Sequence, residues 1–142
     1  MRVWLALGLA LLLASPARAE SGVLEVTVTG VRSTKGHVLV AVCDKATFLA
    51  PSCTYHGRVP SKVGSVTVRL TGIPPGTYAA QAFQDANDNG KVDQNFFGMP
   101  LEGIGFSNDA PILFGPPQFS DAAFQLTAAG GSIHFALRYF TK

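Results

Sequence analysis

The sequence is poor in charge and has no apolar run long enough to cross a bilayer. Charged residues make up 14% of the chain. Its longest apolar run, residues 3–13, falls well short of the ~20 residues that a membrane-spanning helix needs. No segment sustains a 3.6-residue apolar period, which argues against a helical domain. There is no Gly-x-Ser-x-Gly motif, and the three histidines lack metal-ligand spacing, so the chain carries no catalytic signature.

The short apolar run indicates a secretory signal peptide. Met1-Arg2 precedes the run, Ser15-Pro16 ends it, and Ala17-Arg18-Ala19 follows as a small-x-small cleavage site. We therefore expect cleavage after Ala19, a signal peptide over residues 1–19, and one soluble domain over residues 20–142 in the periplasm or the medium.

The domain that remains after cleavage is formally neutral. Removing Arg2 and Arg18 leaves nine basic and nine acidic residues. This balance argues against a nucleic-acid partner, which requires a basic stripe, and against a membrane-surface role driven by charge.

The two cysteines, Cys43 and Cys53, are predicted to form a disulfide in an oxidising compartment. A short closed loop of this kind stabilises the fold by about 2–3 kcal/mol. A redox or metal pair is the alternative, but the C-x-x-C spacing is missing.

Period-two alternation dominates the rest of the chain and predicts about seven short strands. Such a pattern favours an all-β fold, an antiparallel sandwich of immunoglobulin-like or transthyretin-like type, with a small closed barrel as the alternative. The last two strands are expected to form a hairpin across residues 128–131. The clearest strands cover residues 24–29, 38–43, 66–70, 77–84, 123–126 and 132–140.

Two short segments suggest local anchors. Pro74-Pro75-Gly76-Thr77-Tyr78, at the entry to a strand, is typical of a tyrosine corner, in which the hydroxyl ties a loop to the sandwich. Asp44 is placed to cap a helical turn over residues 45–49.

Residues 93–120 form a long segment without an evident strand or helix. Segments of this length in a compact domain are often functional. The aromatic residues are too numerous to lie in water, so we expect the segment to fold back over one sheet edge. Four of them are candidate contacts for a small apolar molecule, a glycan or an envelope protein: Phe96, Phe97, Phe106 and Phe114.

Residues 85–93, which we call the acidic loop, match the first nine positions of an EF-hand-type calcium loop. Position 12 is Phe96 instead of a bidentate glutamate, and Glu102 is a candidate to complete the shell. The pattern predicts at most a weak Ca²⁺ site, with Kd about 10⁻⁴–10⁻³ M. An ion-free polar turn is the alternative. The candidate ligands are Asp85, Asn87, Asn89, Lys91 through its carbonyl, Asp93 and Glu102.

Three motifs together resemble a bacterial secreted family, domain of unknown function 2141. They are Gly76-x-Tyr78, then Asp85-x-Asn87-x-Asn89-Gly90-Lys91-x-Asp93, then the glycine-rich run from Phe97-Gly98 to Ser107-Asn108. The resemblance implies a periplasmic or secreted β-sandwich of unassigned role, and the cysteine pair is no part of it.

A non-catalytic binding or accessory module of the cell envelope is the leading prediction. A rigid sandwich with a long aromatic loop is a common way to present a recognition surface. A structural or envelope-stress protein without a ligand is one alternative. A hydrolase that uses Asp85, Asp93 or Glu102 as carboxylates is another, which would need them to face an open cleft.

Overall fold

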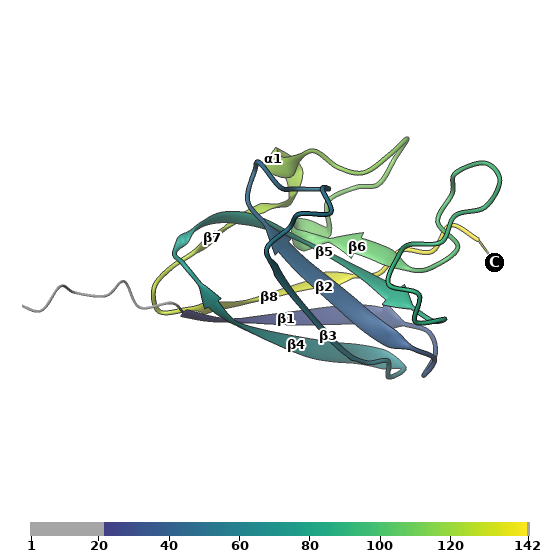
Figure 1. Ribbon diagram of the computed structural model, residues 1–142, viewed down its shortest axis with the longest axis horizontal. Helices are drawn as coiled ribbons and strands as arrows, with labels where there is room; N and C mark the ends of the chain where they lie inside the picture. The colour runs from purple at the N-terminus through teal and green to yellow at the C-terminus, as the bar shows by residue number, and fades with distance from the viewer. Residues whose placement is uncertain (1–21, 142) are drawn as a thin grey trace, which may run out of the picture.

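The computed structural model describes residues 22–141, so the predicted signal peptide, residues 1–19, lies outside the described residues. Two β-sheets pack face to face as an all-β sandwich (Figure 1). The immunoglobulin-like or transthyretin-like type stays a prediction. The elements are β1 (Gly22–Val31), β2 (His37–Cys43), β3 (Tyr55–Pro60), β4 (Gly64–Ile73), β5 (Gly76–Asp85), β6 (Ile104–Phe106), the 3-10 turn η1 (Ser107–Asp109), α1 (Phe119–Ala122), β7 (Ala123–Leu126) and β8 (Gly131–Ala136).

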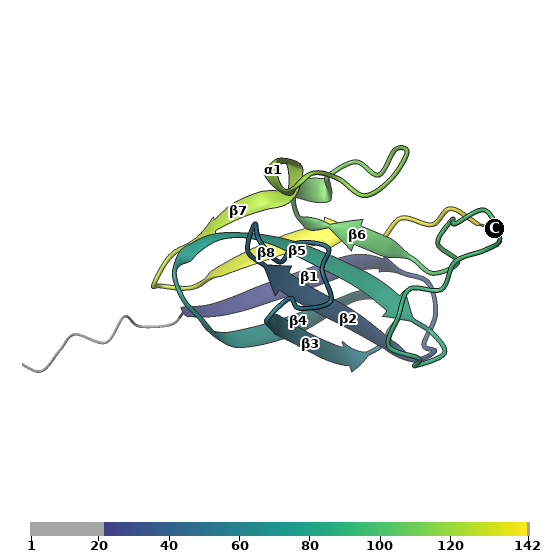
Figure 2. The same cartoon turned by 45° about the horizontal axis from the view of Figure 1, so that its top comes forward.

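The smaller sheet has the order β4-β1-β8, with β1 antiparallel to β4 and parallel to β8. Leu24, Val26 and Val28 of β1 are almost fully buried, whereas the residues between them are partly or fully exposed. This alternation places one face of the strand on the core and the other toward water. Because β1 and β8 run in the same direction, their carboxyl ends meet at one end of the sandwich, as seen in Figure 2.

The larger sheet has the order β3-β2-β5-β6, and β7 also pairs with β5. The Tyr78 hydroxyl of β5 donates a hydrogen bond to the Pro74 carbonyl oxygen at 2.7 Å, so the tyrosine corner is confirmed. The predicted disulfide is confirmed as well, since Cys43 at the end of β2 is bonded to Cys53. The bond closes the turn that leads from β2 to β3.

The main core lies between the two sheets, and a second, smaller cluster lies on the outer face of the larger sheet. In that second cluster Ala79 of β5 packs with Phe106 and with Ala122 of α1. Ser107 is completely buried beneath it and binds β5 through the backbone of Ala80, at 2.9 Å for the Ala80 N–H. This cluster holds the chain between β6 and β7 against β5.

Three predictions about the fold were wrong in detail. Residues 123–136 do not form a hairpin, because β7 pairs with β5 and β8 pairs with β1 in the opposite sheet. The segment 93–120 contains β6, η1 and the start of α1 and is not wholly irregular. Asp44 Oδ1 does accept the Thr47 N–H at 2.9 Å, but residues 45–49 form turns and no helix.

Between residues 22 and 141 the longest helix is a single turn, and none is long and apolar enough to cross a membrane.

Candidate functional site

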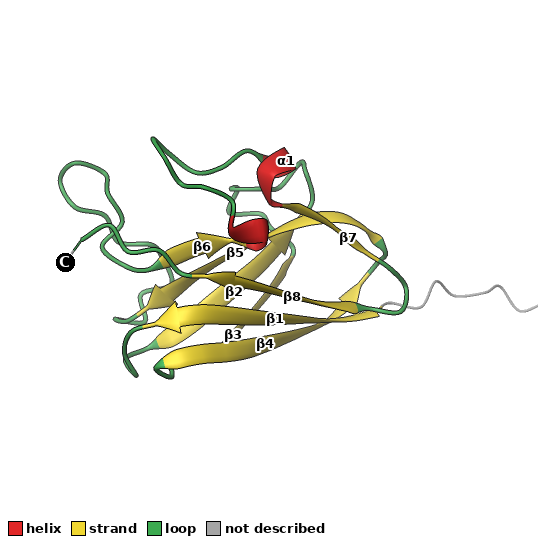
Figure 3. Ribbon diagram, turned by 180° about the vertical axis from the view of Figure 1, so that it is seen from behind, coloured by secondary structure: helices red, strands yellow, loops and turns green. Residues whose placement is uncertain are grey.

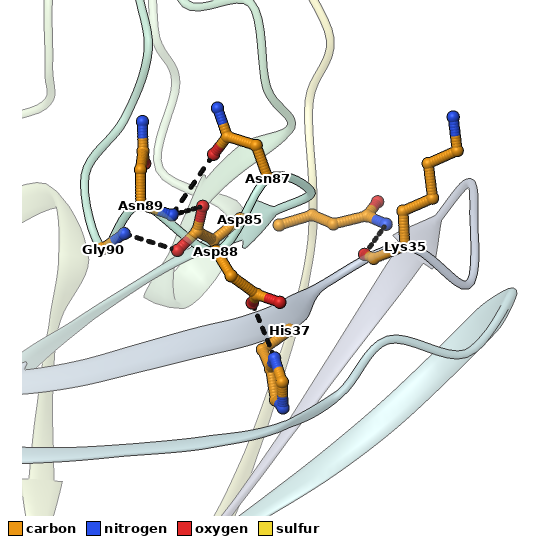
Figure 4. Close-up of polar contacts among 8 residues, drawn as sticks. Lys35, His37, Asp85, Asn87, Asp88, Asn89 and Gly90 are labelled. Carbon is orange, nitrogen blue, oxygen red and sulfur yellow. Dashed lines mark hydrogen bonds and ion pairs between the residues drawn. The ribbon is translucent and has the colours of Figure 1, made fainter.

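The acidic loop follows β5 directly. Its first carboxylate, that of Asp85, accepts hydrogen bonds from backbone N–H groups of the loop. Asp85 is 2% exposed. Its two carboxylate oxygens accept the N–H groups of Asn89, at 3.1 Å, and Gly90, at 2.7 Å (Figure 4). Gly90 has a positive φ of 77°, which a side chain disfavours, so a glycine fits this turn. Asp85 therefore closes the loop in the way that a capping carboxylate closes a helix.

The other side chains of the acidic loop converge on Asp93. Its carboxylate accepts the side-chain amides of Asn89, at 2.8 and 2.9 Å, and of Asn87, at 2.8 Å. These hydrogen bonds, that of Asn89 foremost, lower the pKa of Asp93 below its usual range. The backbone N–H of Lys91 donates to the Asn89 side-chain oxygen at 3.1 Å. The loop thus brings the predicted ligand side chains at positions 3, 5 and 9 together.

Glu102 lies nine residues after Asp93, and the chain between them turns back so that Glu102 contacts the acidic loop. Its Oε2 accepts the Asp93 N–H at 3.3 Å, and the residue is only 9% exposed. Burial is the main reason that the pKa of Glu102 is raised, and the negative charges of Asp93 and Asp85 add to it. The prediction that Glu102 folds back onto the loop agrees with this position.

The carboxylates of this region do not by themselves make a metal cage. Within residues 22–141 there is no cluster of three or more His, Cys, Asp or Glu side chains arranged to hold a metal ion. Oxygens for a cation would have to come also from Asn87, Asn89 and the backbone, as in other calcium loops. Asp93 and Asp85 nevertheless carry negative charge close to the buried Glu102, and a cation bound there would relieve the repulsion among the three carboxylates.

The same carboxylates are poorly arranged for hydrolysis. Asp93 and Glu102 line an open depression of about 560 Å³, and their pKa values are shifted in opposite directions, as in acid–base pairs. However, Asp93 is already bound by two amides, and Glu102 is bound to the Asp93 backbone. These hydrogen bonds are internal to the acidic loop and its return, so a structural role explains both carboxylates better.

Asp88, at position 4 of the acidic loop, points away from these groups. Its carboxylate contacts the ring of His37 in β2, with Nδ1 and Oδ1 2.7 Å apart (Figure 4). This contact joins the loop to the neighbouring strand.

Residues 94–100 form a tight turn on top of the acidic loop, which we call the aromatic hairpin. Gln94 and Pro100 form an isolated antiparallel bridge at its base. The Asn95 side-chain oxygen accepts the N–H groups of Phe97 and Met99, both at 3.0 Å. The hairpin therefore has a fixed backbone, and Phe96 and Phe97 lie at its tip.

Residues 110–118, which we call the second aromatic loop, are fixed at both ends. Before the loop, Asp109 Oδ1 accepts the Ala136 N–H at 2.8 Å, and the Asn108 side-chain amide donates to the Ala123 carbonyl oxygen at 2.8 Å. After it, Gln118 and Asp121 form a capping box at the start of α1. Figure 3 shows this loop and the aromatic hairpin projecting beyond the strands, on the side of the domain where the chain ends.

The four phenylalanines proposed as contacts separate into two groups. Phe96 is 98% exposed, Phe97 is 85% exposed and Phe114 is fully exposed. Phe106 is buried against Phe48, with ring centroids 6.0 Å apart, so its proposal as a contact was wrong. The expectation that the segment hides its aromatic residues over a sheet edge was wrong for the other three.

A groove of about 340 Å³ lies between the aromatic hairpin and the second aromatic loop. We call it the apolar groove, and its volume is within the range of small-ligand sites. Sequence reasoning missed Met99 and Leu113, although both are exposed in this region. For Met99 the available signal was its position between Gly98 and Pro100 in a turn, and for Leu113 the local sequence offers none. The apolar side chains of the groove are Phe97, Met99, Pro100, Ile112, Leu113, Phe114, Pro116 and Phe140.

Comparison with known proteins identifies a family and nothing closer. A family model described as "Uncharacterized protein conserved in bacteria (DUF2141)" matches residues 26–134. No curated protein and no solved structure matches the chain.

Proposed function

The chain belongs to the DUF2141 family, and on this premise we propose that it is an exported, non-catalytic binding module that takes an apolar ligand in the groove between its two aromatic loops. The observation that carries the proposal is the exposure of Phe96 and Phe97, on a hairpin with a hydrogen-bonded backbone, and of Phe114, on a loop anchored at its two ends. Large apolar side chains that lie together on a protein surface are typical of an interaction site or a ligand-binding groove.

The chemistry of the apolar groove favours an apolar ligand over a glycan. Gln94 supplies the one polar side chain among the residues that line it. A sugar needs several hydrogen-bond partners to replace its water, and among the lining side chains only Gln94 is one. Phenylalanine, leucine and methionine side chains gain instead by removing apolar surface from water, at about 25 cal/mol per Å².

Export is supported by the disulfide. Cys43 and Cys53 are bonded, and such bonds persist mainly in oxidising compartments. We therefore place the protein in the periplasm or the medium, with residues 1–19 removed as a signal peptide.

The test uses the fluorescence of N-phenyl-1-naphthylamine, a neutral apolar probe, added to the exported, oxidised protein. The triple variant Phe96→Ser/Phe97→Ser/Phe114→Ser should bind the probe at least about tenfold more weakly, because Phe97 and Phe114 line the groove and Phe96 packs against Phe97. The control is Val63→Ser, which removes another exposed apolar side chain, 60% exposed, from the turn between β3 and β4. Equal affinity in the wild type and the triple variant would contradict the proposal.

A second candidate function, weak calcium binding, is favoured by one specific observation. The side chains at positions 3, 5 and 9 of the acidic loop meet at Asp93, and Glu102 lies against the same residue. Rotation of the two asparagine amides would turn their oxygens toward a cation. In this role the ion stabilises the base of the aromatic hairpin and takes no part in chemistry.

Thermal melting in 10 mM CaCl₂ and in chelator tests this candidate. At about a hundredfold excess over Kd, binding adds about 2.7 kcal/mol, which raises Tm by several degrees. Asp93→Asn should abolish the rise, whereas Asp88→Asn, at a position that faces His37, should keep it. An equal Tm in calcium and in chelator removes the candidate.

A further inference from the structure

A second depression adjoins the apolar groove and carries positive charge. It has a volume of about 570 Å³, and Ile112, Leu113 and Phe140 line both it and the apolar groove. Arg32 and Arg138 lie in its wall. The two depressions therefore form one surface that changes from apolar to basic along the second aromatic loop.

The topology brings the two arginines together. Arg32 follows the end of β1, and Arg138 follows the end of β8 by two residues. Because β1 and β8 are parallel neighbours, the two strands deliver their next residues to the same end of the sandwich. Nothing in the local sequence around either arginine indicates this proximity, since the two residues are far apart in the chain.

Both guanidinium groups are available to an external anion. Arg32 and Arg138 are exposed, and neither forms an ion pair with any of residues 22–141. Arg32 is held in place by Tyr139, with its Cζ 3.8 Å from the ring centroid. The one carboxylate in the depression, Asp109, uses Oδ1 to accept the Ala136 N–H. Two cations against one acid leave the depression with a net positive charge.

From this juxtaposition we propose that the ligand is a single-chain amphipathic anion, with its apolar chain in the apolar groove and its carboxylate or phosphate at Arg32 and Arg138. This assignment rests on the proposed function and gives its ligand a charge. The positive charge beside the apolar groove distinguishes an amphipathic anion from a neutral hydrocarbon as the ligand. Guanidinium groups suit the purpose because they present paired donors to carboxylate or phosphate oxygens.

The experiment compares two fluorescent probes with the same apolar chain, the anion 11-(dansylamino)undecanoate and its neutral methyl ester. The wild-type protein should bind the anion about tenfold more tightly than the ester, and the difference should shrink as salt is raised. The double variant Arg32→Gln/Arg138→Gln should bind both probes equally and keep the wild-type affinity for the ester. The control, Arg58→Gln/Arg69→Gln, removes two exposed arginines that line a different depression, between β3 and β4, and should keep the preference.

Arg138→Glu provides a variant that leaves the contact of Arg32 with Tyr139 intact. It should weaken binding of the anion more than Arg138→Gln does, with ester binding and Tm unchanged. Equal wild-type affinity for the two probes, or a preference that survives in the double glutamine variant, would overturn the anion site while leaving the apolar groove in place. Failure of both probes to bind would instead reject the proposed function. Binding to anionic phospholipid vesicles without binding of either free probe would replace the single-molecule ligand by a membrane surface.

Discussion

The acidic loop and the two aromatic loops lie at the same end of the sandwich, yet they use their side chains in opposite ways. In the acidic loop, both oxygens of Asp85 and both of Asp93 accept hydrogen bonds from the loop itself. The aromatic hairpin has a hydrogen-bonded backbone and the second aromatic loop is anchored at its two ends, whereas the large side chains of Phe96, Phe97 and Phe114 are exposed to water.

This difference separates support from recognition. Polar groups that satisfy one another contribute to the order of a loop and have little left for a partner. Exposed apolar rings contribute nothing to the fold in which they stand and gain free energy only when something covers them. Under the proposed function, the acidic loop therefore supports the base of the site, and the exposed rings supply the surface for binding.

The largest effect is expected from a comparison of two phenylalanines in the same segment, one buried and one exposed. Phe106→Ala should lower the free energy of unfolding by about 3–5 kcal/mol, because the ring is buried with Phe48 and Ala122 and leaves a cavity. Phe114→Ala should change it by less than about 0.5 kcal/mol, because its ring is fully exposed. Urea denaturation of the two variants measures both values.

The two substitutions should affect probe binding in the opposite order to their effects on stability. Phe114→Ala should weaken the binding of N-phenyl-1-naphthylamine, and Phe106→Ala should leave it nearly unchanged under conditions where the variant is folded. A large stability loss from Phe114→Ala would mean that this ring belongs to the core, and the separation of support from recognition would fail.

A smaller effect is expected from Asp85→Ala. The substitution leaves the N–H groups of Asn89 and Gly90 without their carboxylate, and we expect a loss of about 2–3 kcal/mol in the free energy of unfolding. Asp88→Ala is the matched control, since its carboxylate is partly exposed, and it should cost less than about 1 kcal/mol. Urea denaturation measures both. A smaller loss for Asp85→Ala than for Asp88→Ala would show that the acidic loop is not held by its first carboxylate.

Much of the fold could be predicted because a strand that is buried on one face has an apolar residue at every second position of its sequence. β1 and β4 alternate valine or leucine mainly with polar residues, β2 repeats valine at every second position, and all three were predicted. β3 was missed because its Tyr55-His56-Gly57-Arg58-Val59-Pro60 sequence is that of an edge strand, with few buried side chains. The wrong hairpin has a different cause: alternation locates a strand but says nothing about which sheet it joins.

The candidate site could be predicted only in its local parts. The acidic loop was found because its ligand-type residues follow one another at fixed spacing, and the structure does gather Asn87, Asn89 and Asp93. Which aromatic rings are exposed depends on how two separate loops pack, and hydrophobic residues are ordinarily expected inside. The pairing of Arg32 with Arg138 depends on the parallel register of β1 and β8, which no local pattern encodes.

The smallest predicted effect concerns the pH dependence of the acidic loop, tested with Glu102→Gln. Burial foremost, with the charges of Asp93 and Asp85, raises the pKa of Glu102 above its ordinary 4.5, so the folded protein binds its proton more tightly than the unfolded chain. The stability that Glu102 contributes is therefore present below pH 4.5 and is lost as pH rises through its folded pKa. Glutamine keeps an acceptor for the Asp93 N–H and carries no charge.

Without calcium, Glu102→Gln should therefore raise Tm at pH 7 by no more than a few degrees and should lose this advantage at pH 4. Glu25→Gln, at a half-exposed carboxylate of β1, is the control and should show no such dependence. If calcium binds, 10 mM CaCl₂ should reverse the order at pH 7, because the ion favours the ionised carboxylate that the variant lacks. An advantage for Glu102→Gln that is larger at pH 4 than at pH 7 would show that the carboxyl of Glu102 is not destabilised by its neighbours, and the acidic loop would lose its electrostatic reason for a cation.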